Sequence, residues 1–204
     1  MLQAAIASVT RQSYGHVQLV VATPLQDDVM WRVLQRHAHE LIHVPCPSHA
    51  GQPVPHGARA YEAFNAGLAQ ASGEVVVFLG ERECLATSSV LSEVAQVFAD
   101  PCVDAVYGDL LYVPANAPST PLQRWRAPPL SRAALAHGWL TPLGALFVRR
   151  VWFERVGCFD ARLGTAADFD KVGQLFRQPG FRAVRLQEPC SLRWVEDTST
   201  PLNG

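Results

Sequence analysis

The sequence lacks several features that would assign it to a class at once. None of its apolar runs approaches the roughly 20 residues that a membrane-spanning helix needs. Charge of neither sign is in excess, since 17 Lys and Arg stand against 18 Asp and Glu, so no basic face predicts a nucleic-acid partner. The opening MLQAAIASVTRQSYG has no charged leader, long apolar stretch or clean cleavage site, and we therefore expect no secretory signal.

Paired cysteines are also missing. The five cysteines are odd in number and scattered, and no two of them form a C-x-x-C pair. They are Cys46, Cys84, Cys102, Cys158 and Cys190. This pattern is typical of reduced thiols in a cytoplasmic protein and argues against a disulfide framework or a zinc site.

What is present indicates one α/β domain. The 204 residues are 49% hydrophobic, enough for a sizeable core, and we predict a single domain over residues 1–204. Apolar runs typical of strands alternate with segments of helical spacing. Strands are predicted at 16–22, 41–45, 74–79, 103–113, 144–150 and 181–186, and helices at 2–11, 27–38, 58–71, 88–98, after 150 and at 166–180. Such alternation predicts a layered α/β fold with a mainly parallel central sheet.

The stretch GEVVVFLGERECLA contains the most informative local pattern. Its apolar strand stops at Gly80 and is followed directly by Glu81, Arg82 and Glu83. Ligands of open α/β sheets bind beyond the carboxyl ends of the strands, so we expect this charged turn to lie at a ligand site. The residues alone leave three interpretations open: a metal and phosphate site, the remnant of one, or a solvated turn.

Four separated blocks share the order and spacing of one family. They are AYEAFNAGLAQASGEVVVFLGERE, VDAVYGDLLYV, GWLTPLGALFVRRVWFERVGCFD and AADFD. Together they resemble family 2 glycosyltransferases of the GT-A fold, a Rossmann-like three-layer sandwich, and most nearly the bacterial members that act in polysaccharide biosynthesis. The resemblance covers roughly residues 1 to 190, and it depends on the agreement of all four blocks.

The resemblance implies transfer of a sugar, with inversion, from a nucleotide-diphospho-sugar donor to a glycan or lipid-linked acceptor. In that family, carboxylates at the end of the strand matching 74–79 hold Mg²⁺ or Mn²⁺ against the diphosphate, as hard oxygen ligands do. The block AADFD carries the general base, and Asp168 falls on that position, with Asp170 in reserve. Asp168 also precedes a predicted helix, so an N-cap role is the competing interpretation.

The sequence departs from the family at three places. Arg82 stands where a metal ligand is expected, and a guanidinium cannot ligate a cation. Either Arg82 pairs with the diphosphate and Glu83 still ligates a metal, or the motif has decayed. Leu143 replaces a histidine common beside the donor phosphates. The third departure is in the amino-terminal part, where the family's first strand is absent and residues 23–28 replace an acidic turn that grips the nucleotide. The absent strand leaves a sheet edge for a partner or a second copy.

Further candidates come from the matched blocks. Glu62 and Asp109 are predicted to border the donor, together with Glu81, Arg82 and Glu83. Trp139 and Asp170 are predicted to border the acceptor. For Trp139 the reason is that an aromatic face suits a sugar ring. The competing interpretations are a solvated helix acid for Glu62, a strand-end carboxylate bonded to a loop for Asp109 and a core side chain for Trp139.

The sequence thus predicts an inverting glycosyltransferase, cytoplasmic, with association at the inner face of a membrane and homo-oligomerisation as options. A divalent cation is a doubtful cofactor, because Arg82 stands in the motif. The alternative function is a non-catalytic glycosyltransferase-like protein that binds a glycan or a protein partner. A chain whose reading frame begins further upstream is a third option.

Overall fold

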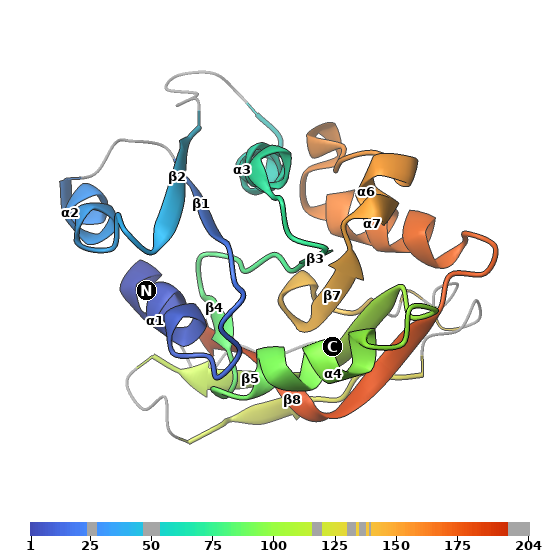
Figure 1. The fold of residues 1–204 in the computed structure, drawn as a ribbon. Coiled ribbons are helices and arrows are strands. Elements are labelled where there is room, and N and C mark those ends of the chain that lie inside the picture. The colour runs from blue at the N-terminus through green and yellow to red at the C-terminus, as the bar shows by residue number, and fades with distance from the viewer. Residues whose placement is uncertain are drawn as a thin grey trace.

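A mixed six-stranded sheet lies at the centre of the computed structural model (Figure 1). The structure describes residues 1–23, 28–46, 54–115, 120–129, 134, 138 and 140–195. The helices are α1 (Leu2–Thr10), α2 (Asp28–Arg36), α3 (Ala58–Gln70), α4 (Val90–Phe98), α6 (Val151–Val156) and α7 (Ala167–Phe176), with 3-10 turns η1 (Leu143–Ala145) and η2 (Ala161–Ala166). The strands are β1 (Leu19–Thr23), β2 (Leu41–Pro45), β3 (Val75–Val76), β4 (Glu83–Leu85), β5 (Ala105–Pro114), β6 (Gln123–Trp125), β7 (Leu146–Arg149) and β8 (Ala183–Val195).

The strand order of the large sheet is β3-β7-β5-β8-β4, and β6 pairs with the outer part of β5. Within the described residues, only β5 and β8 run parallel in it; β3 with β7, β5 with β7, β4 with β8 and β5 with β6 are antiparallel. The parallel strands β1 and β2 form a separate small sheet. The α/β expectation is therefore confirmed, but in the described part of the chain the large sheet is mixed and not mainly parallel.

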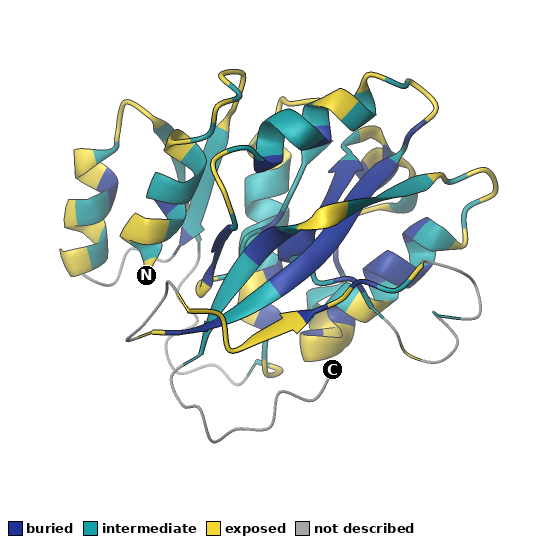
Figure 2. Ribbon diagram, turned by 90° about the horizontal axis from the view of Figure 1, so that it is seen from below, coloured by how far each residue is buried: buried dark blue, intermediate teal, exposed yellow. Residues whose placement is uncertain are grey.

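Helices cover both faces of the large sheet, which gives three layers. One apolar cluster joins α3, α6 and α7 to the sheet, and a second joins α4 and Val9 of α1 to its other face. Figure 2 shows the most buried stretches in the central strands, and β5 is buried over its first six residues, Ala105 to Leu110. Helix α3 also packs on β1, where a side-chain carbon at Gly67 would lie 3.7 Å from Ala22. One helix thus bridges the two sheets.

The local sequence pattern predicts the position of most helices and strands, but it does not predict which strands pair. Residues 41–45 form β2 as predicted, and the helix expected at 58–71 is α3. Of the strand expected at 74–79, only Val75–Val76 pairs, with β7. β4 and β6 were not predicted, because one begins on a charged residue and the other lies in a proline-rich stretch. The last strand was expected to end at 186 but β8 continues to Val195.

An aromatic cluster fills the space between α3 and the sheet. The rings of Phe78 and Phe159 meet edge to face with centroids 5.1 Å apart, and Tyr61 lies 5.5 Å from Phe159. The amide of Asn65 donates to the carbonyl of Phe159 and accepts from its N–H, both at 2.9 Å. A residue of α3 therefore fixes the backbone of a loop that follows α6, and so orients α3 against η2 and α7.

No helix among the described residues is both long and apolar enough to cross a membrane. All five cysteines are free thiols, and Cys84 and Cys190 are buried. Burial raises the pKa of Cys84 to about 11 and that of Cys190 to about 12, so both remain protonated at neutral pH.

The aromatic cluster yields a stability prediction. Phe159 is 4% exposed, and Phe159→Ala should lower the free energy of unfolding by about 3–5 kcal/mol, because it removes contacts and leaves a cavity. Phe169→Ala is the matched control, since Phe169 is 39% exposed and should cost well under 1 kcal/mol. Urea unfolding followed by circular dichroism measures both. Equal losses would contradict this description of the core.

Candidate functional site

A cavity of about 320 Å³ opens where α3, the segment after β3, β4, α7 and β8 meet. Its walls combine aromatic, acidic and basic side chains. They are Ala60, Tyr61, Phe64, Gly80, Glu81, Arg82, Glu83, Pro142, Leu143, Asp168 and Arg193. The charged turn predicted to lie at a ligand site does line this cavity, together with the predicted base Asp168. Leu143, which replaces the family histidine, also lines it.

Glu83 is held in place from three sides. It opens β4 and is the cross-strand neighbour of Arg193 in β8, so the sheet register sets the two side chains together. Oε1 of Glu83 accepts from Nε of Arg193 at 3.0 Å and from Nη2, and Oε2 accepts from the Gly80 N–H at 2.8 Å. A side-chain carbon at Gly144 would lie 2.7 Å from Oε2, so any larger residue there would displace the carboxylate. At 4% exposure, Glu83 is not a solvated turn charge.

Glu81 and Arg82 differ from Glu83 in exposure. Both are exposed and form the turn before β4. The carbonyl of Arg82 accepts from the N–H of Trp194 at 2.9 Å, which ties the backbone of Arg82 to β8 directly after Arg193. The turn that carries Arg82 is therefore fixed beside the part of β8 that carries Arg193.

Arg193 carries a stable positive charge. Its side chain is 41% exposed. Burial acts to lower the pKa of the guanidinium, but the Glu83 carboxylate, with smaller contributions from Tyr112 and Asp168, outweighs burial and raises the pKa above its usual value. Arg193 thus remains a cation at every physiological pH, and Asp168 is near enough to act on it.

Asp168 lies in the first turn of α7, half-buried at the cavity wall. The N-cap of α7 is Ala166, so Asp168 does not have the N-cap role that was its competing interpretation. Its Oδ1 accepts from the Phe169 N–H at 2.7 Å. Burial raises the pKa of Tyr61 to about 12, and the charge of Asp168 adds to the rise. Tyr61 therefore keeps its proton next to the Asp168 carboxylate.

The side chains of the cavity do not fit a divalent cation. Hard cations need several free carboxylate or carbonyl oxygens, and both oxygens of Glu83 already accept hydrogen bonds from protein donors. Among the residues that the structure describes, no three His, Cys, Asp or Glu side chains come together as a metal site would require. Arg82 and Arg193 would in addition repel a cation held between them.

Other predicted site residues lie outside the cavity wall. Asp109 is 1% exposed and accepts from Arg124 at 2.7 Å, from Arg185 at 3.1 Å and from the Ala127 N–H at 2.9 Å. Burial alone would raise its pKa, but these donors hold it below the usual value. Asp109 thus fastens β6 and the loop behind it to β5 and β8, and its predicted donor role stays a prediction.

Glu62, Asp170 and Trp139 complete the predicted set. Glu62 is half-buried on α3, and its charge acts on the thiol of Cys46 just beyond β2. Asp170 accepts from Gln174 at 2.7 Å, and Gln174 in turn accepts from the buried Lys171. Trp139 lies outside the described residues. The donor role of Glu62 and the acceptor roles of Asp170 and Trp139 therefore also stay predictions.

Sequence reasoning missed Arg193, Tyr61 and Gly144. Arg193 lies beyond the strand predicted to end at 186, because Gln187-Glu188-Pro189 interrupts the apolar pattern of β8. Tyr61 carries no catalytic signal in the sequence, and it is the turn of α3 that directs it toward the cavity and the core. The sequence does contain arginines near its end that could pair with Glu83. Only the register of β4 with β8 shows that Arg193 is the partner.

Comparison with known proteins supports the fold. No family model and no curated protein sequence matches the chain. TarS of S. aureus (residues 1–349, in complex with UDP) superimposes with a TM-score of 0.65 at 17% identity, over 94% of this chain and 56% of that chain. The mannosyltransferase PcManGT from Pyrobaculum calidifontis, in complex with GDP-Man and Mn²⁺, gives a TM-score of 0.65 at 18% identity, over 96% and 53%. A 4-diphosphocytidyl-2C-methyl-D-erythritol synthase gives 0.51 at 14%, over 91% and 79%.

These likenesses confirm the GT-A-like α/β fold that the sequence resemblance predicted. At such low identity they show the fold alone. The chain spans about half the length of TarS 1–349 and of the mannosyltransferase.

The Tyr61 environment yields a prediction with a definite sign. A folded pKa of about 12 against a usual 10 means that the folded state keeps this proton after the unfolded state has lost it. The stability that Tyr61 contributes is therefore complete below pH 10 and is lost as the pH rises toward 12, at about 1.4 kcal/mol per pH unit. Tyr61→Phe should flatten the fall of the unfolding free energy across that window. An unchanged slope would contradict the placement of the hydroxyl.

Proposed function

We propose that this chain transfers a sugar from a nucleotide-diphospho-sugar to a hydroxyl-bearing acceptor, with inversion and with Asp168 as the general base. The observation that carries the proposal is the half-buried carboxylate of Asp168 in the same cavity as Arg82 and Arg193. A proton acceptor and cations are the groups that such a displacement needs on its two sides. The likeness to folds solved with UDP and with GDP-Man supports the choice of donor class.

The proposed step is a single displacement. The acceptor oxygen attacks the anomeric carbon while its proton passes to a carboxylate oxygen of Asp168. The bond from that carbon to the diphosphate oxygen breaks, and the nucleoside diphosphate leaves with the bonding electrons. Tyr61 keeps its proton and can donate to Asp168 or to the acceptor hydroxyl. Attack opposite the leaving group inverts the configuration.

We propose further roles for residues that line the cavity. Glu81 and Arg82 line the cavity and form the donor side. Mg²⁺ or Mn²⁺ is not part of the proposed step, since both oxygens of Glu83 already accept hydrogen bonds from protein donors and Arg193 pairs with its charge. We propose a glycan or lipid-linked acceptor of a polysaccharide pathway in the cytoplasm, as the sequence blocks suggest.

One observation favours a second function. The Glu83–Arg193 pair occupies the place where a metal would be expected, and a cavity without metal could bind a glycan or a nucleotide without turning it over. The second candidate is therefore a non-catalytic glycosyltransferase-like binding protein.

Replacement of the proposed base separates the two functions. Asp168→Asn should lower the rate of nucleoside diphosphate release from UDP- and GDP-sugars by about 10²–10⁴-fold, because the amide cannot take the acceptor proton. Affinity for UDP or GDP should change little. Asp100→Asn is the matched control and should retain activity, since Asp100 pairs with Arg182 and does not line the cavity. Turnover unchanged in Asp168→Asn would refute the base role, and binding without turnover in the native chain would favour the second function.

A further inference from the structure

The guanidinium of Arg193 has one edge engaged and one edge left for a ligand. Nε and Nη2 both donate to Oε1 of Glu83, which uses the side edge of the planar fork. Nη1 and the second hydrogen of Nη2 form the other edge, and Nη1 makes no hydrogen bond within the described part of the chain. Arginine forks bind phosphate oxygens through two parallel N–H groups on one edge. The remaining edge of Arg193 is therefore a ready phosphate-binding element.

Glu83 makes that edge rigid. A surface arginine loses considerable side-chain entropy when it closes on a ligand, but Arg193 is already fixed by the fork to Glu83. Glu83 is in turn fixed by the Gly80 N–H and by close contact with Gly144. The pair also neutralises the buried carboxylate, which would otherwise repel an anion.

A second cation stands beside the first. Arg82 lines the same cavity, and its backbone bonds to Trp194, the residue after Arg193. The two arginines can therefore approach one diphosphate group, Arg82 from the turn before β4 and Arg193 from β8. Asp168 acts electrostatically on Arg193, which places the proposed base within the same small space.

We propose that Arg193, assisted by Arg82, binds the donor diphosphate directly and takes the place of a divalent cation, with Glu83 as the residue that orients Arg193. This inference rests on the proposed function, because it names how the donor of that same site is held. It reverses the role expected for Glu83 from the sequence, from metal ligand to positioning residue. It also makes nucleotide binding independent of metal.

Calorimetric titration of the full chain with UDP and with GDP, each in EDTA and in Mn²⁺, tests the inference. We expect the better-bound nucleotide to show the same affinity in both buffers. Binding that appears only with Mn²⁺ would overturn the inference and leave the proposed function standing. No binding of either nucleotide in either buffer would overturn the proposed function and the inference with it.

Two substitutions separate the roles of the ion pair. Arg193→Lys keeps the charge and can still pair with Glu83 but has no second edge, so affinity should fall by about tenfold or more. Glu83→Gln has one acceptor oxygen and cannot serve both the Gly80 N–H and the Arg193 fork, so Arg193 loses its orientation and affinity should fall by about tenfold in EDTA and in Mn²⁺ alike. A metal-ligand role for Glu83 predicts instead a loss confined to the Mn²⁺ buffer, with affinity in EDTA unchanged, and that result would overturn the inference.

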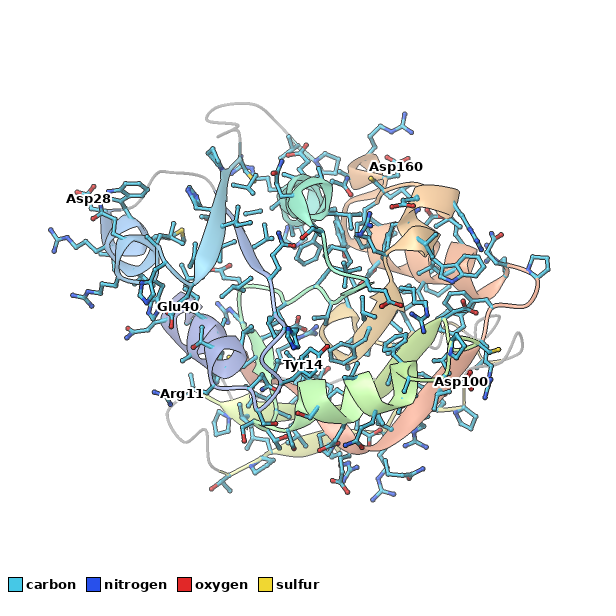
Figure 3. The ribbon with its side chains drawn as sticks, viewed as in Figure 1. Arg11, Tyr14, Asp28, Glu40, Asp100 and Asp160 are labelled. Carbon is cyan, nitrogen blue, oxygen red and sulfur yellow. The ribbon has the colours of Figure 1, made fainter. Side chains whose placement is uncertain are left out.

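A matched control excludes general charge effects. Arg162→Lys should leave affinity unchanged, because Arg162 is 89% exposed and pairs with Asp160, which Figure 3 shows at the periphery beside α6 and α7. Thermal unfolding of each variant shows whether it is folded. If Arg193→Lys does not fold, the comparison of EDTA with Mn²⁺ in the native chain and in Glu83→Gln still decides the question.

Discussion

The ion pair between Glu83 and Arg193 holds the functional region together. It joins β4 to β8, draws the loop before β4 inward through the Gly80 N–H, and lies so close to Gly144 in η1 that a larger residue there would displace it. Loss of either partner would leave the other without its hydrogen bonds, at a cost of about 1–3 kcal/mol, moderated because water reaches Arg193. Three segments distant in sequence therefore meet around one carboxylate.

The same pair determines what the cavity can bind. A carboxylate with both oxygens satisfied is a poor ligand for a hard cation, whereas a fixed guanidinium with an open edge suits a phosphate. The fold likeness to structures with UDP and with GDP-Man gives the donor class its support, and the residues of this chain suggest a different way of holding it. The departure at Arg82 then reads as a change of charge partner rather than the decay of a motif.

The sequence was sufficient for the fold class, most helices and the cavity's charged turn. The 3.6-residue spacing of α3 and the apolar runs of β2 and β5 are local properties, and they appear where expected. Strand direction, the length of β8 and the role of Arg193 depend on pairing between distant segments, which no local pattern records. The same holds for Asp109. Its place in a strand is a local property, but its partners Arg124 and Arg185 come from β6 and β8, and the sequence does not reveal them.

The most direct test of this account is a crystal structure of the chain with UDP or GDP, grown without divalent cations. The account predicts a phosphate oxygen within hydrogen-bond distance of Nη1 of Arg193, with the Glu83–Arg193 fork intact and Asp168 facing the open side of the diphosphate. A nucleotide bound away from this cavity, or one that displaces Arg193 from Glu83 and leaves the carboxylate facing the phosphates, would contradict it.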